Sequence, residues 1–492
     1  MSLARAPQPA RLPTGVPGLD RITGGGLFAG SAYLLAGLPG TGKTVLSNQV
    51  AYGLAARGGS TVYMTFLGES HDRMLGHLAG FGFFDPAAVG RSISYVSGYG
   101  RLEEAGLEGM LRLLRELIAT QRPALLVIDG LPSIEAAAGS PTAFRRFLSE
   151  LHTVLGLSRT LALLTSHPRA GAATAENTVV DGVIELRTPE LALRSVRLLR
   201  VVKLRGSSYL EGQHFFRIRD GGLEVYPRLD VASETPGDPP YDAGERRRFD
   251  VPRLDEMLGG GVVAGSTTML LGAPGAGKTL AGITFLGAGA RGGEPGLYFG
   301  VHESPKRLVA KGAGIGLDLG PHVASGALTI EWRPPVEQLL DDIGGQIIEA
   351  TERRGLRRVL IDGLDGLRAA VPYAHRLPQF LSVLTNELRA RGVTTLIAAE
   401  TRDLLAPRVE GPVESVSAIV DYVLLLRYVE LRSRLYRLVS VVKSREGAHD
   451  PAIRELRIGP AGLEVGGTFG AAEGLLGGFA RPSSSGEEAE RP

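Results

Sequence analysis

The chain of 492 residues contains no cysteine, which excludes disulfide bonds, cysteine-ligated zinc and thiol catalysis. It also lacks an apolar run long enough to span a bilayer, and its first residues show no apolar segment typical of a secretory signal. An excess of one charge is missing too, because 54 basic and 52 acidic residues leave a formal net charge of +2. Such a balance gives no general attraction to nucleic acid or to anionic membranes. We therefore expect a cytoplasmic protein that does not contact a membrane.

The sequence does contain a glycine-rich loop, and it contains it twice. Residues 37–44 read GLPGTGKT and residues 272–279 read GAPGAGKT, and both fit the pattern GxxxxGK[ST]. Each loop follows a short apolar run that predicts a buried strand, and each precedes a segment that is predicted to be helical. Backbone N–H groups in such a loop, at the N-terminus of a helix, bind phosphate groups. Both loops therefore predict a nucleotide site, with ATP as the ligand.

The two loops predict most of the binding residues. The lysine reaches the β- and γ-phosphates, where it also acts in catalysis, and the threonine hydroxyl is placed for Mg²⁺. The predicted ATP-binding residues of the loops are Gly40, Thr41, Gly42, Lys43, Thr44, Gly275, Ala276, Gly277, Lys278 and Thr279.

An aspartate ends a later apolar run in each half of the chain. Asp129 and Asp362 stand where a carboxylate can hold the Mg²⁺ shell opposite Thr44 and Thr279. The alternative interpretation is an acidic residue that only begins a loop. We predict that these two threonines and two aspartates form the metal sites.

These landmarks belong to a long internal repeat. Asp20 lies 23 positions before Lys43, and Asp255 lies 23 positions before Lys278. Further along, residues 161–166 align with residues 395–400. Such regular spacing indicates one domain that has been duplicated.

Apolar runs alternate with helical patterns in each repeat, which predicts an α/β fold with a mostly parallel sheet flanked by helices. The Pro-rich segment between the repeats predicts a linker, and the Gly/Ser/Glu-rich C-terminal segment has too few apolar residues to form a core. The expected organisation is a flexible N-terminus at 1–12, a first domain at 13–229, a linker at 230–245, a second domain at 246–466 and a disordered tail at 467–492.

A glutamate follows the second apolar run of each repeat. Glu69 and Glu303 are candidates to orient or deprotonate the attacking water, because phosphoryl transfer needs little covalent help. The alternative is that each glutamate only favours the N-terminus of a helix that begins at Ser70 or Ser304.

Two pairs of cations recur late in the repeats, Lys203 with Arg205 and Lys443 with Arg445. A solvated basic strand edge is one interpretation. Their matched positions, far from their own loops, favour delivery to the nucleotide of a neighbouring subunit. We therefore predict Arg205 and Arg445 as catalytic arginine fingers that act in trans.

This order of motifs resembles the circadian KaiC family of RecA-like ATPases. The resemblance covers about residues 12–466 and is detailed in segments 203–208, 424–432 and 449–455. It implies a double-ring homohexamer with ATP at the subunit interfaces. It also implies that a neighbour's ATP meets Lys203, Leu204, Arg205 and Ser207 in the first ring, and Lys443, Arg445 and His449 in the second.

The sequence departs from the family pattern at two places. Gly68 and His302 stand where the family has the first of two adjacent glutamates, which acts as the base. Ser417 and Ala418 stand at the Ser-Thr pair that the family phosphorylates, so Ser417 is the remaining acceptor. As an alternative, Ser417 is an ordinary loop serine.

Three functions are compatible with these patterns. The first is an ATP-hydrolysing ring with weak Ser/Thr autokinase activity in signalling or clock-like regulation. The second is a nucleotide-gated scaffold with little hydrolysis. The third is a DNA-acting recombinase or helicase, which needs cationic loops; Arg169 stands alone in one such loop, and acidic residues accompany Arg402 and Arg408 in the other. Nucleic acid is the less favoured partner, and no regulatory protein partner is identified.

Overall fold

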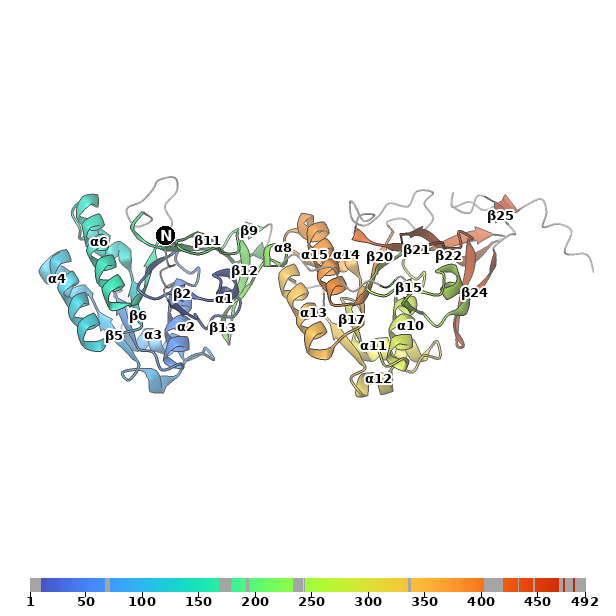
Figure 1. Cartoon of the computed structure of the whole chain (residues 1–492), viewed down its shortest axis with the longest axis horizontal. Helices are drawn as coiled ribbons and strands as arrows, with labels where there is room; N and C mark the ends of the chain where they lie inside the picture. The colour runs from blue at the N-terminus through green and yellow to red at the C-terminus, as the bar shows by residue number, and fades with distance from the viewer. Residues whose placement is uncertain are drawn as a thin grey trace, which may run out of the picture. The chain divides into compact units, whose positions relative to one another are not determined.

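Figure 1 shows a computed structural model of the chain, whose contacts group into two compact units, Met1–Ala232 and Ser233–Pro492. The structure describes residues 10–66, 71–167, 178–191, 194–232, 242, 244–334, 338–401, 419–431, 433–445, 447–468, 472–473 and 481–482.

A nine-stranded sheet forms the centre of the first domain. In their order across the sheet, the strands are β13 (Gly222–Tyr226), β12 (His214–Arg219), β11 (Leu198–Leu204), β8 (Gly182–Arg187), β3 (Ala32–Gly37), β7 (Leu161–Ser166), β6 (Leu125–Asp129), β4 (Thr61–Thr65) and β5 (Ile93–Ser97). Strands β8 to β5 run parallel, and β11, β12 and β13 continue the sheet antiparallel. The central strands are unbroken runs of buried residues, as expected where helices cover both faces.

Helices cover this sheet and begin where the sequence supplies a suitable first residue. Helix α2 (Lys43–Ala55) starts directly after Gly42, which has a φ of 105° that glycine adopts without strain. Helix α6 (Pro141–Ser158) starts after Ser140, whose hydroxyl accepts from the N–H of Ala143. The other elements are β1 (Arg11–Leu12), α1 (Leu19–Ile22), β2 (Leu27–Phe28), α3 (His71–Leu78), η1 (Pro86–Ala88), α4 (Tyr99–Gln121), α5 (Leu131–Ala136), β9 (Glu190–Leu191), β10 (Arg194–Ser195) and α8 (Leu229–Ala232).

The second domain repeats this design. Its strands, in their order across the sheet, are β18 (Leu328–Trp332), β17 (Gly296–Gly300), β19 (Arg358–Asp362), β20 (Thr394–Glu400), β16 (Thr267–Gly272), β21 (Tyr422–Leu431), β22 (Arg434–Ser444), β23 (Arg454–Gly459) and β24 (Gly462–Thr468). Its other elements are β14 (Arg246–Arg247), α9 (Pro252–Met257), β15 (Val262–Val263), α10 (Lys278–Arg291), α11 (Pro305–Ala313), α12 (Gly320–Ala324), α13 (Leu340–Arg354), α14 (Leu364–Ala370), η2 (Ala374–Arg376), α15 (Leu377–Ala390), β25 (Ala472–Glu473) and β26 (Arg481–Pro482). The expected α/β architecture with two P-loop domains is confirmed.

Strand register corrects one detail of the repeat. Asp129 lies beside Thr165 in the first sheet, and Asp362 lies beside Ala398 in the second. Thr165 therefore corresponds to Ala398, and the alignment of 161–166 with 395–400 was wrong by one residue. The error matters because a shift of one residue exchanges the two faces of a strand.

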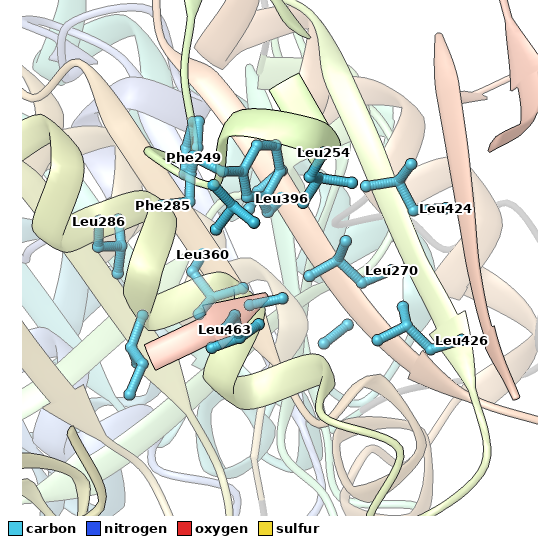
Figure 2. Packing of buried hydrophobic residues seen from close by; sticks show 14 of the residues in the cluster. Phe249, Leu254, Leu270, Phe285, Leu286, Leu360, Leu396, Leu424, Leu426 and Leu463 are labelled. Carbon is cyan, nitrogen blue, oxygen red and sulfur yellow. The ribbon is translucent and has the colours of Figure 1, made fainter. Parts of the chain in front are cut away.

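The cores explain how the sheets are held. In the first domain, one cluster packs between the sheet and α2, and another packs between the sheet and the pair α4 and α6. In the second domain, Figure 2 shows Phe249 and Phe285 near Leu286 and Leu360, within a large buried cluster. Burial of such side chains supplies most of the driving force for folding. Within the described part of the chain, no helix combines the length and the apolar composition that crossing a bilayer requires.

Candidate nucleotide-binding sites

Both P-loops leave the carboxyl end of a central parallel strand, β3 or β16, and enter a helix. Gly40 and Gly42 have φ values of 78° and 105°, and Gly275 and Gly277 have values of 76° and 107°. A Cβ on Gly42 would lie 2.8 Å from Cδ1 of Ile218, and one on Gly277 would lie equally close to Ile458. Conformation therefore favours glycine at all four positions, and space also restricts Gly42 and Gly277. The loop can form the anion-binding nest that a phosphate fits.

Each P-loop lysine folds back onto its own loop. The Nζ of Lys43 donates to the carbonyl oxygens of Gly37 and Leu38 at 2.6 and 3.0 Å. Lys278 donates to Gly272 and Ala273, both at 2.9 Å, and its Nζ also lies 3.7 Å from Glu400.

Burial lowers the pKa of both P-loop lysines. The charge of Asp129 opposes this effect at Lys43, and Glu400 is the first of the groups that oppose it at Lys278. An incoming phosphate would add further negative charge beside these ammonium groups and so favour their charged form.

The predicted metal residues meet in pairs. The hydroxyl of Thr44 donates to Asp129 Oδ2 at 3.0 Å, and the hydroxyl of Thr279 donates to Asp362 Oδ2 at 2.9 Å. These contacts join the first turn of a helix to the end of strand β6 or β19. The sequence prediction that these residues lie close together therefore agrees with their observed geometry.

An open cavity of about 480 Å³ lies over the first P-loop. Its walls include the loop, Asp129, the segment Thr165 to His167 at the end of β7, and Ile218 from β12. Its volume lies within the range of small-molecule sites. Lys43, Thr44 and Asp129, the residues predicted to contact phosphate and metal, are among its walls.

The predicted water-orienting glutamates are only partly described. Glu69, with Gly68 and Ser70, lies outside the described residues. Glu303 Oε1 accepts from Lys311 Nζ at 2.5 Å, and its Oε2 lies 3.9 Å from Arg307. In this conformation Glu303 is paired with helix α11, of which Ser304 is the N-cap residue without a side-chain cap bond.

The late cations lie at the edge of the sheet opposite their own P-loops. In the first domain, Leu199 is level with Gly37, and Lys203 lies four residues further along β11, about 13 Å at the usual rise per residue. Lys203 Nζ donates to the carbonyl of Val180 at 2.6 Å, and the N–H of Arg205 donates to Asp181 at 2.9 Å.

The second domain repeats this arrangement. Lys443 Nζ donates to Val420 at 2.6 Å, and the N–H of Arg445 donates to Asp421 at 3.0 Å. Neither cation pair is directed toward its own nucleotide loop.

Comparison with known proteins agrees with this geometry. The model of the family described as "ATPase: KaiC" matches residues 12–230 and 248–468. The chain belongs to the KaiC family of ATPases. A circadian clock protein KaiC3 of Synechocystis is 26% identical over 95% of this chain and 94% of its own length. A circadian clock oscillator protein KaiC of Thermosynechococcus vestitus is 27% identical over 98% of this chain and 93% of its own length.

The other residues that the KaiC resemblance assigned to a neighbour's ATP differ in accessibility. The Leu204 side chain is buried in its own core, so only its backbone is available to a neighbour. Ser207 accepts from Arg11 and donates to the carbonyl of Ser208 at 2.7 Å. His449 is half-buried, and Ser417 lies outside the described residues.

Sequence reasoning missed several residues of these KaiC-type sites. Tyr63 and Tyr298 donate to the predicted metal-site aspartates, both at 2.9 Å, and their matched places in the repeat could have revealed them. The carbonyl of Gly40 accepts from Arg197 in the first domain. That of Gly275 accepts from Tyr428 in the second, and nothing in the spacing of the motifs indicated either contact.

Proposed function

We propose that this KaiC-family ATPase binds MgATP in both P-loops and hydrolyses it in a homohexameric ring. The observation that carries the proposal is the same constellation in two domains: a glycine nest, a lysine aimed along it, and a Thr-Asp pair beside it. A nest binds phosphate through backbone N–H groups, and the lysine adds a charge that follows the phosphoryl group. Two copies with the same geometry support two working sites.

The donor set of each site fits Mg²⁺. Thr44 with Asp129, and Thr279 with Asp362, place a hydroxyl and a carboxylate oxygen within 3.0 Å of each other. Mg²⁺ prefers oxygen ligands and is bound through one or two carboxylates together with phosphates and water. No group of three or more acidic or histidine side chains gathers in the described ranges, which suits a metal that arrives with the nucleotide. When bound, Mg²⁺ neutralises the charge that develops on the phosphate oxygens.

The position of the late cations supports assembly with copies of the same chain. Lys203 and Arg205 cannot serve their own P-loop from the opposite edge of the sheet. Val202 and Val442, next to the two lysines, are 44% and 59% exposed, so each cation pair is accompanied by an apolar side chain that a neighbouring subunit could cover. We therefore propose that ATP is bound between subunits and that Arg205 and Arg445 act in trans.

A nucleotide-gated scaffold with slow hydrolysis is the second candidate, and one observation favours it. His302 stands in place of the first family glutamate, and Glu303 is held in an ion pair by Lys311. A carboxylate in an ion pair is a poor base for the attacking water. The second domain would then bind ATP tightly and turn it over slowly.

The named relatives are clock proteins, which supports a clock-like or signalling role for this chain. A cytoplasmic location stays a prediction. Weak autophosphorylation at Ser417 stays a prediction. DNA binding is the least favoured alternative, and Arg169, Arg402 and Arg408, on which it would depend, lie outside the described residues. Salt-sensitive binding of single-stranded DNA would support that alternative.

The decisive experiment measures phosphate release and assembly mass with and without MgATP. We expect ATP-dependent hexamers in the parent, measurable turnover, and loss of turnover in Lys43→Ala/Lys278→Ala. Assembly with tight ATP binding but no phosphate release would favour the scaffold. A parent that neither binds nor hydrolyses ATP would contradict both.

A further inference from the structure

Behind each metal-site aspartate stands a buried tyrosine that donates to it. Tyr63 on β4 and Tyr298 on β17 lie on the strand next to the aspartate, and both are fully buried. Each hydroxyl donates to the same Oδ2 oxygen that accepts from the P-loop threonine, at 2.9 Å in both domains. A phenol is protonated at neutral pH, so each tyrosine hydroxyl is the donor and the carboxylate oxygen the acceptor.

The two domains support this bond differently. In the first domain, Asp129 Oδ1 also accepts from Thr165 at 2.7 Å, so the carboxylate is held at both oxygens. In the second domain, Ala398 replaces that threonine. Among the described residues, the Asp362 carboxylate accepts from Thr279 and Tyr298 alone. Since Thr279 is the predicted metal ligand, Tyr298 is the donor left to hold Asp362 once a metal binds.

We propose that Tyr298 and Tyr63 are positioning residues for the metal-site carboxylates, and that Tyr298 acts alone whereas Tyr63 shares the task with Thr165. This inference rests on the proposed MgATP site and adds two residues that act on it through the aspartates. Groups that orient a metal ligand from behind commonly change metal affinity 10- to 100-fold when they are removed. The expected loss is therefore larger where a single donor remains.

The test measures Mn²⁺ binding to the full chain in the presence of ATPγS, with free Mn²⁺ followed by electron paramagnetic resonance. A Lys43→Ala background silences the first site, so Tyr298→Phe reports on the second. We expect Tyr298→Phe to weaken Mn²⁺ binding roughly tenfold. In the Lys278→Ala background, we expect Tyr63→Phe to weaken it only about threefold, because Thr165 remains. Combining Thr165→Val with Tyr63→Phe should weaken Mn²⁺ binding at the first site about as much as Tyr298→Phe weakens it at the second.

Matched controls separate positioning from packing. Tyr422 and Tyr33 are equally buried, and their hydroxyls accept from the backbone N–H of Val263 and Phe28, away from the aspartates. Tyr422→Phe and Tyr33→Phe should leave Mn²⁺ affinity within about twofold. Adding Ala398→Thr to Tyr298→Phe should restore Mn²⁺ affinity, since it supplies the hydroxyl that Thr165 provides in the first domain.

The outcomes distinguish this inference from the proposed function. A parent that retains no Mn²⁺ with ATPγS would overturn the proposed function and the inference together. A parent that binds Mn²⁺, with Tyr298→Phe no weaker than Tyr422→Phe, would overturn the positioning role alone. Equal losses at the two sites, or no rescue by Ala398→Thr, would overturn the division of labour between tyrosine and threonine.

Discussion

The two domains have the same framework but differ in what surrounds the predicted metal-site aspartate. In the first domain, Asn48 donates to the Tyr63 hydroxyl at 3.0 Å, and Tyr95 donates to Asn48 at 2.8 Å, so a buried polar chain supports the aspartate. In the second domain, Ile283 and Ile330 occupy the corresponding places. Duplication therefore retained the backbone of the site, while the network behind it became either polar or apolar. The first site is held by many hydrogen bonds, and the second by packing and one tyrosine.

The largest expected effect concerns the two arginines that are proposed to act on the ATP of a neighbouring subunit. Arg205→Ala and Arg445→Ala should each reduce hydrolysis in their own ring about 10³-fold, the lower end for an arginine finger. Phosphate release in the Lys278→Ala and Lys43→Ala backgrounds isolates the two rings. Arg115→Ala, which removes an exposed pair with Glu150, is the control and should change nothing.

Mixed assemblies show whether the arginine acts in trans. In the Lys278→Ala background, Lys43→Ala subunits mixed with Arg205→Ala subunits should regain turnover, because some interfaces combine an intact P-loop with an intact arginine. If mixing restores nothing while the oligomers remain intact, Arg205 does not act on a neighbour.

The next effect concerns stability and reverses the order expected for metal binding. Tyr63→Phe removes the partner of Asn48 and Ser47 as well as Asp129, so we expect a loss of about 2–3 kcal/mol in the free energy of unfolding. Tyr298→Phe removes one bond in apolar surroundings and should cost about 1 kcal/mol. Denaturant unfolding measures both, and fluorescence of Trp332, the only tryptophan, reports on the second domain. Equal losses would mean that the polar network contributes nothing.

A smaller effect concerns the rate of the second site. Lys311→Ala removes the ion pair of Glu303, and we expect turnover in the Lys43→Ala background to rise about threefold as the carboxylate becomes available. Lys306→Ala, another exposed lysine of α11, is the matched control. A rise that persists in Lys311→Ala/Glu303→Gln would show that Glu303 is not the group released.

How much of this the sequence could predict depends on the range of the interaction. The placement of the P-loops at helix starts, and of Asp129 and Asp362 at strand ends, was predictable because these features require fixed residue types at fixed spacings. The donor of the Gly40 carbonyl was not, because Arg197, just before strand β11, lies more than 150 residues away in the sequence. The slip of one residue between β7 and β20 had a similar cause: both segments are apolar, and only pairing with β6 and β19 sets their register. Composition fixes the elements, whereas packing decides which side chains meet.

The smallest expected effect concerns Glu400, an acidic residue beside the P-loop lysine of the second domain that has no acidic counterpart in the first. Glu400 lies 3.7 Å from Lys278, and the corresponding residue in the first domain is His167. Near neutral pH, Glu400→Gln should tighten ATP binding in the second site about twofold to fivefold, because the carboxylate competes with phosphate for the lysine and repels it. His167→Glu should weaken the first site by a similar factor. Calorimetric titration in the matching Lys→Ala background measures each, and added salt should diminish both effects.

Measuring ATP affinity at alkaline pH distinguishes an effect of the Glu400 charge from an effect of packing, because only the charge effect should change with pH. Burial lowers the pKa of Lys278 and Glu400 raises it, so Glu400→Gln should lower that pKa further. The variant then loses its ammonium charge at a lower pH than the parent, and its advantage in ATP affinity should shrink and reverse as the pH rises. An advantage that is independent of both salt and pH would mean that Glu400 acts by occupying space rather than by its charge.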